Sequence, residues 1–121
     1  MKVLVYNLMF NKIAAVTKAC AAVNAQMITL KGDDIHTSIE SLLAGSNQGF
    51  TPKDSQINPK ELMVFEGFND DAMETFLNTY NATGIPKVVY KAMVTPINLK
   101  WTPAYLYEHL LDEVKDTQNI L

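Results

Sequence analysis

The sequence has few of the features that mark specialised classes of protein. It contains one cysteine, so an internal disulfide is excluded and a reducing compartment is expected. No apolar run approaches the ~20 residues of a membrane span. No cluster of lysine or arginine appears and the net charge is −3, so the electrostatic footprint of a nucleic-acid binder is missing. We therefore expect a cytoplasmic protein with no membrane or nucleic-acid partner.

The composition is that of one folded domain. Hydrophobic residues make up 48% of the 121 residues and charged residues 19%, which is ordinary for a globular protein. We predict a single domain over residues 1–121, with a first half at 1–45, a connector at 46–60 and a second half at 61–115. The connector is rich in Ser, Asn, Gln, Gly and Pro and is longer than most connections.

The pattern of the first half predicts strand, helix, strand, helix. Residues 3–6 are apolar on both faces, which suits a central strand covered on both sides. Apolar residues then recur at helical spacing over 13–23, and Asn24 can end this helix in the left-handed conformation. A short strand at 27–30 and a second helix that stops at Gly45 complete the half.

The second half repeats this order. Residues 62–65 are again apolar on both faces, and Asn69 is a good cap for the helix that follows. A fourth strand is expected within 88–94. Thr102 followed by Pro103 is a strong start signal for the last helix.

These elements predict an α/β fold with a four-stranded, mainly parallel sheet and helices on both faces. Parallel strands need helical crossovers, which both halves supply. The first and third strands carry no charge and should be central neighbours, running parallel. The fourth has Lys87 and Lys91 beside or within it, which suits an edge guarded against pairing. The expected strand order is 2-1-3-4.

Several short strings in the second half resemble one known family. They are Phe65-Glu66-Gly67-Phe68, Asn69-Asp70-Asp71, Thr83-Gly84-Ile85-Pro86, the Thr95-Pro96-x-Asn98-x-x-Trp101 string and Leu106-Tyr107-Glu108. Through them, Glu61 to about Glu113 resembles a bacterial domain of unknown function, DUF3783. The resemblance implies a compact α/β domain and brings no activity with it.

No set of residues amounts to a reaction, so we assign no catalytic residue, metal ligand or cofactor. Cys20 lies on the apolar stripe of its helix, which favours a core residue over a nucleophile. His36 and His109 have no second histidine or cysteine at ligand spacing, so surface or capping roles are favoured. Gly67 does not belong to a phosphate-binding loop, since the sequence has neither a GxGxxG nor a GK(S/T) motif.

The candidate binding site lies where parallel strands end, because open sheets bind ligands outside the carboxyl ends of their strands. If the first and third strands are parallel, the loops that follow them meet at one end of the sheet and form a crevice. Two asparagine-capped helices start at this end, so their free backbone amides point toward the crevice. The predicted ligand-binding residues are Asn7, Glu66, Gly67, Asn69, Thr95 and Asn98. The absence of lysine from these loops favours a carboxylate, a carbonyl or a partner's backbone over a phosphate.

A structural interpretation of the same residues stays open. Glu66 can point to solvent or accept from turn amides, and Asn98 can bond its own turn. Trp101 is expected to be largely buried, covering the gap between the last helix and the sheet.

The leading interpretation is a non-enzymatic binding or regulatory module that acts through a protein partner or homodimerisation. The alternative is a binder of, or weak enzyme on, a small anionic or carbonyl-bearing metabolite at the carboxyl ends of the first and third strands.

Overall fold

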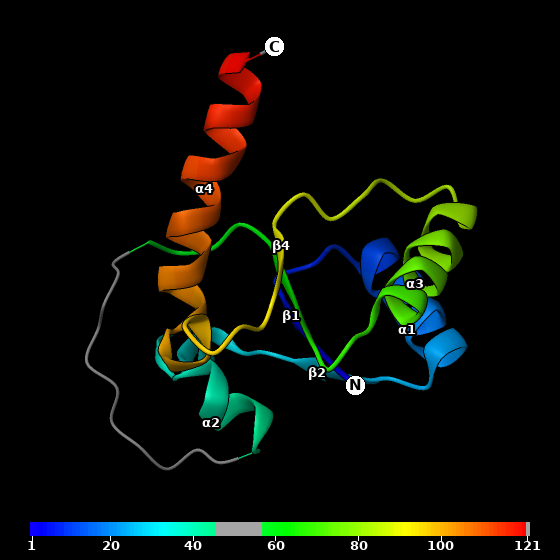
Figure 1. Ribbon diagram of the computed structural model, residues 1–121, viewed down its shortest axis with the longest axis horizontal. Helices are drawn as coiled ribbons and strands as arrows, with labels where there is room; N and C mark the ends of the chain where they lie inside the picture. Colours follow the sequence, from blue (N-terminus) through cyan, green and yellow to red (C-terminus); the bar gives the residue numbers. More distant parts are fainter. Residues whose placement is uncertain (46–56, 121) are drawn as a thin grey trace.

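The computed structural model describes the backbone of residues 1–45 and 57–120, and the side chains of these ranges up to Glu113. Most of the predicted connector, 46–60, therefore lies outside the described residues. The elements follow the predicted order (Figure 1). They are β1 (Lys2–Tyr6), α1 (Phe10–Val23), β2 (Gln26–Thr29), the 3-10 turn η1 (Gly32–His36), α2 (Ile39–Leu43), β3 (Leu62–Glu66), α3 (Asp70–Ala82), β4 (Lys91–Met93), the 3-10 turn η2 (Asn98–Lys100) and α4 (Pro103–Ile120).

The sheet has the expected strand order, β2-β1-β3-β4, but not the expected direction at its centre. β1 is parallel to β2 and β3 is parallel to β4, whereas β1 and β3 are antiparallel. The prediction that β1 and β3 run parallel is therefore wrong. The chain enters β3 at the end where β1 finishes, since Tyr6 pairs with Leu62. At that end Asn7 Nδ2 donates to the carbonyl oxygen of Lys60 at 2.8 Å.

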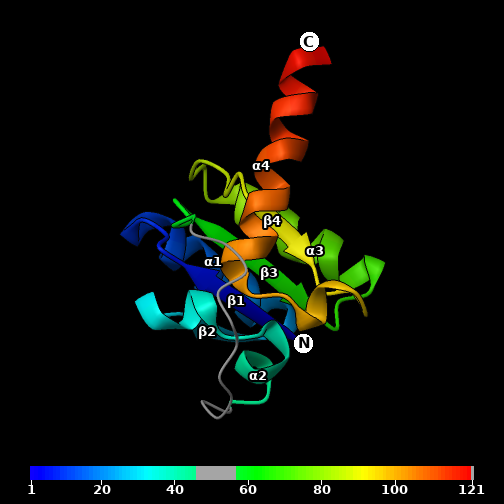
Figure 2. The ribbon, with the colours of Figure 1, turned by 90° about the vertical axis from the view of Figure 1, so that its left-hand side faces the viewer.

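Helices cover both faces of the sheet, as predicted (Figures 1 and 2). Alternate residues of the two central strands point to opposite faces. Val3 and Met63 belong to the core that includes α1 and α3, whereas Leu4 and Val64 belong to the core that includes α2 and α4. This two-sided burial is why both strands are apolar on both faces. The far end of α4 extends beyond the sheet (Figures 1 and 2).

The two halves are related by an approximate two-fold axis. After β1 the left-handed residue is Asn7 (φ 56°), and after β3 it is Gly67 (φ 77°). Asn24 (φ 62°) after α1 corresponds in the same way to Gly84 (φ 73°) after α3. The same correspondence matches Leu4 with Val64, and these residues lie directly opposite each other in the β1–β3 pair. The axis therefore passes between the two central strands.

Most of the predicted helix ends are confirmed. Asn69 accepts a hydrogen bond from the Ala72 amide at 2.8 Å, and Thr102 accepts one from the Tyr105 amide at 3.2 Å. The start of α1 differs: Met9 is its cap residue and makes no side-chain bond to the helix. Asn7 or Asn11 was expected to cap this helix; Asn7 instead lies in the turn before it, with φ 56°. Within the described ranges, no helix is long and apolar enough to cross a membrane.

Candidate functional site

The antiparallel centre of the sheet separates the residues of the predicted site. Antiparallel strands finish at opposite edges, so the turn after β1 and the turn after β3 lie at opposite ends of the sheet. Asn7 is at one end, bonded to Lys60. Glu66, Gly67 and the segment after β4 are at the other. The crevice expected between β1 and β3 is therefore not formed by these residues.

Three predicted residues do come together at the Glu66 end. Glu66, Gly67 and Thr95 line a shallow hollow of about 360 Å³, whose remaining walls come mainly from Leu43 and Leu99 and their neighbours. A Cβ on Gly67 would sit 3.6 Å from the Met1 Cα, which is ordinary contact. The glycine is therefore needed for its positive φ rather than for space.

Asn98 holds the turn after β4 together. Its side chain is 7% exposed. Its Oδ1 accepts from the Thr95 amide at 2.8 Å and its Nδ2 donates to the Met93 carbonyl oxygen at 2.9 Å. In the turn after β2, Asp34 makes the equivalent of the first bond: its Oδ2 accepts from the Lys31 amide at 2.8 Å. The contacts of Asn98 support the structural interpretation of this residue.

The outer side of β4 is an open surface with exposed apolar side chains. β4 ends the sheet, and Met93 and Ile97 beside it are 41% and 71% exposed. A hollow of about 420 Å³ lies on its α3 side and one of about 440 Å³ on its α4 side. Asn69 lines the first of these hollows. Trp101 lines the second and is partly rather than largely buried, with its indole stacked 4.5 Å from the His109 ring.

The backbone of β4 presents hydrogen-bonding groups to this open side. The Met63 amide donates to the Tyr90 carbonyl at 3.0 Å, and the Val94 amide donates to the Phe65 carbonyl at 2.8 Å. Peptide groups alternate along a strand, so those of Lys91 and Met93 face away from β3. Asn98 already bonds the Met93 carbonyl, which closes the row at that end.

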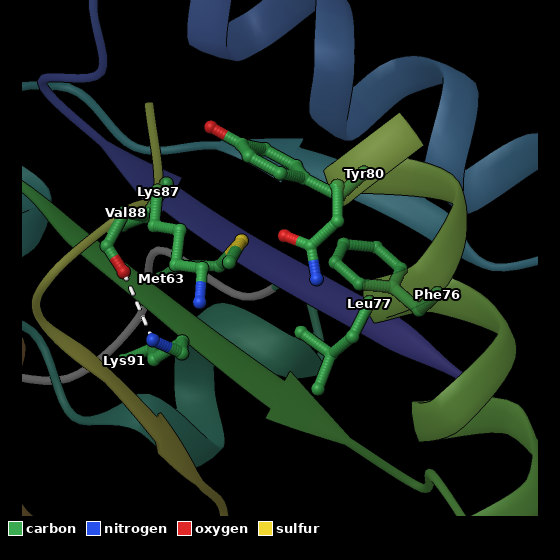
Figure 3. Close-up of a pocket in the computed structure, with 8 residues that line it drawn as sticks. Met63, Phe76, Leu77, Tyr80, Lys87, Val88 and Lys91 are labelled. Carbon is green, nitrogen blue, oxygen red and sulfur yellow. Dashed lines mark hydrogen bonds between the residues drawn. The ribbon is translucent and has the colours of Figure 1, made fainter. Parts of the chain in front are cut away.

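A second kind of site lies between the end of α3 and the segment that leads into β4 (Figure 3). It is a pocket of about 110 Å³. Its lining residues are Met63, Phe76, Leu77, Tyr80, Asn81, Lys87, Val88 and Lys91. The Tyr80 hydroxyl donates to the Pro86 carbonyl at 2.7 Å, and Lys91 Nζ donates to the Val88 carbonyl at 3.1 Å. These bonds fix the segment against α3 and hold the Lys91 ammonium group at the pocket.

The charge in this pocket is positive. Burial lowers the pKa of Lys91, the neighbouring charge of Lys87 lowers it further, and Glu61 partly offsets both. Glu61 itself is bonded elsewhere: one oxygen pairs with Lys12 Nζ at 2.9 Å and the other accepts from the Val89 amide at 3.1 Å. Among the described side chains, no carboxylate forms an ion pair with Lys87 or Lys91.

Sequence reasoning missed this pocket. It assigned Lys87 and Lys91 only to guarding the sheet edge. The available signal was their spacing, with one lysine at each end of the short run Val88-Val89-Tyr90 directly after a proline. That spacing does not show that the C-terminal turns of α3 provide the opposite wall.

Cys20 and His109, the other candidates, pack against neighbouring side chains. Cys20 is buried in the core under α1, as expected, and burial raises the pKa of its thiol to about 11. His109 stacks on Trp101. In the part of the chain that the structure describes, no three His, Cys, Asp or Glu side chains are grouped so that they could hold a metal ion.

The second half of the chain matches a known family of domains. Residues 61–115 match DUF3783, a domain of unknown function. The match to DUF3783 runs from just before β3 into α4, so it covers one strand-helix-strand-helix unit and confirms the resemblance seen in the sequence. No curated protein and no solved structure matches the chain. The first half of the chain, outside the DUF3783 match, has the same plan in the structure.

Proposed function

We propose that this protein is a non-enzymatic binding module that forms a homodimer through the open edge of β4. One observation carries the proposal: the outward backbone groups of Lys91 and Met93 lie between two apolar hollows, with no neighbouring strand in the described chain. Exposed edge strands pair readily with another strand. Adjacent exposed apolar side chains mark surfaces that contact other proteins.

A two-fold axis at Ala92 suits this pairing. Two β4 strands would then run antiparallel, and Lys91 of each copy would lie opposite the partner's Met93. The outward Lys91 carbonyl of each copy can then accept from the partner's Met93 amide, whereas the Met93 carbonyl is already bonded by Asn98 Nδ2. The two Lys91 ammonium groups are not opposed, which avoids a like-charge contact.

A second copy fits this edge better than a long peptide does. The free row is short, because Asn98 bonds the Met93 carbonyl and ends the accessible stretch. A strand of three residues, such as β4 itself, matches that length. The same kind of pairing already occurs within the chain. β1 and β3, one from each half, pair antiparallel about the approximate two-fold axis between the halves.

Charge changes at Met93 test the dimer. Sedimentation velocity over a range of concentrations gives the dissociation constant of each variant. Met93→Lys places a lysine opposite Lys91 of the partner subunit and should weaken the dimer about two- to fivefold. Met93→Glu places an opposite charge there and should strengthen it by a similar factor. The same two changes at Met9, which is exposed at the start of α1, control for net charge and should leave the constant unchanged.

Two results would contradict the proposal. One is a monomer at every concentration, which would direct the search to a different protein partner. The other is a dimer whose constant responds equally to the changes at Met93 and at Met9.

The alternative function is binding of, or weak catalysis on, a small anionic or carbonyl-bearing metabolite. The observation that favours small-ligand binding is the lysine-lined pocket under α3, and not a crevice between β1 and β3. No acid, base and nucleophile converge on that pocket among the described residues, so we propose no reaction there.

A further inference from the structure

We propose that the pocket between the end of α3 and β4 binds a short-chain aliphatic carboxylate. In this site Lys87 and Lys91 hold the carboxylate, and the apolar wall holds the hydrocarbon chain (Figure 3). The site shares Lys91 with the proposed dimer edge, whereas Lys87 lines the pocket and neither of the hollows beside β4.

The composition of the walls supports an amphipathic ligand. Phe76 and Val88 are fully buried and Met63 is nearly so, which makes the floor apolar and rigid. The charged groups come instead from the segment before β4 and from β4 itself. A ligand with one anionic end and one apolar end satisfies both parts.

The volume limits the length of the ligand. A dry apolar cavity of about 150 Å³ holds a six-carbon ring such as benzene. The pocket of about 110 Å³ therefore suits a carboxylate of about four carbons. Larger acids would have to extend from the mouth into solvent.

The local charge favours a single negative charge on the ligand. Lys87 and Lys91 supply two positive charges, whereas Glu61 is paired with Lys12. The C-terminal end of α3 lies at the pocket and carries about half a negative charge. The sum is between one and two positive charges, which a carboxylate nearly neutralises. Phosphate sites use helix N-termini and rows of backbone amides, whereas this pocket presents the opposite end of a helix.

The test uses sodium butyrate as the probe and the full chain carrying ¹³C-methyl methionine. Met63 is at the floor of the pocket, so its methyl signal should shift saturably with butyrate. Sodium chloride at equal ionic strength and 1-butanol, which has the same chain without the charge, should not reproduce the shift. Inorganic phosphate should bind more weakly than butyrate.

Lysine variants show whether the charge of Lys87 contributes to butyrate binding. Lys87→Gln should weaken butyrate binding about two- to fivefold, the range for an exposed ion pair. Lys87→Arg keeps the charge and should stay close to the wild type. Lys100→Gln is the matched control, because Lys100 is exposed and pairs with Glu40 near α2.

The proposal is overturned by any of four results. The first is no saturable shift of the Met63 methyl. The second is an equal response to 1-butanol, which would show an apolar pocket without anion selectivity. The third is phosphate binding as tight as butyrate binding. The fourth is an unchanged butyrate dissociation constant in Lys87→Gln. Because Lys87 does not line the hollows beside β4, the Lys87 variants distinguish failure of this site from failure of the dimer.

Discussion

Replacing Asn98 with alanine should destabilise the fold far more than the equivalent change in the first half of the chain. Asn98 is nearly buried and makes two side-chain hydrogen bonds, to the Thr95 amide and the Met93 carbonyl. Its counterpart Asp34 is half-buried, and its side chain accepts from the Lys31 amide. The two positions occupy matching turns, after β4 and after β2, so each is a control for the other.

The magnitudes follow from the number of bonds and their burial. A hydrogen bond contributes about 0.5–1.5 kcal/mol net, and more when a partner is left buried without a bond. Asn98→Ala removes two bonds and should cost about 2–3 kcal/mol. Asp34→Ala removes one bond that water can replace and should cost about 0.5–1 kcal/mol. Total stability for this length is on the order of 6–18 kcal/mol, so the protein should stay folded after the Asn98→Ala change. For a domain of this size a loss of about 2–3 kcal/mol lowers Tm by about 10 °C.

Urea unfolding followed by circular dichroism measures both losses. Asn98→Asp provides a third point, because it keeps the acceptor for the Thr95 amide but places a carboxylate oxygen beside the Met93 carbonyl. It should therefore be less stable than the wild type. If Asn98→Ala costs no more than Asp34→Ala, the turn does not depend on the buried side chain, and the ligand-binding interpretation of Asn98 regains support.

Two further predictions concern a turn and a buried thiol. Gly67→Ala should cost about 1–2 kcal/mol, because Gly67 has φ 77°, and Gly67→Asn should cost less, as Asn7 adopts the same conformation; thermal melts rank the two. Burial raises the pKa of the Cys20 thiol to about 11, from its ordinary value of about 9. The thiol therefore ionises first in the unfolded chain. The free energy of unfolding should be unaffected by this group below pH 9 and should fall by about 1–2 kcal/mol as pH rises to 11. Urea midpoints at pH 8 and 10.5 measure this fall, and a slope as steep in Cys20→Ala would contradict it.

The turns and helix starts were the best predicted features, because their chemistry is local. Asn69 and the Thr102-Pro103 pair were recognised as caps from residue type and position. Asn24 was recognised as a left-handed helix end. Asn7 was not recognised as a left-handed turn residue, since asparagine serves both as a cap and in positive-φ positions. Only the match with Gly67 across the two halves makes its role evident.

The candidate sites were predicted less well, because they depend on which segments meet. The six residues proposed for one crevice belong to two ends of the sheet. The lysine-lined pocket needs α3 and the segment before β4 to face each other, and no spacing along the chain specifies this. The DUF3783 strings of the second half include turn and cap residues such as Asn69 and Asn98.

By itself the sequence determined the element order, the two-sided burial of β1 and β3, and the strand order of the sheet. The direction of β3 relative to β1 was decided only by the tertiary structure. Side chains alternate between the two faces of a strand, and turning a strand end for end in the plane of the sheet leaves the same residues on the same faces. The apolar pattern of Leu62–Glu66 is therefore satisfied equally in either direction. The antiparallel choice then placed Asn7 and Glu66 at opposite ends of the sheet.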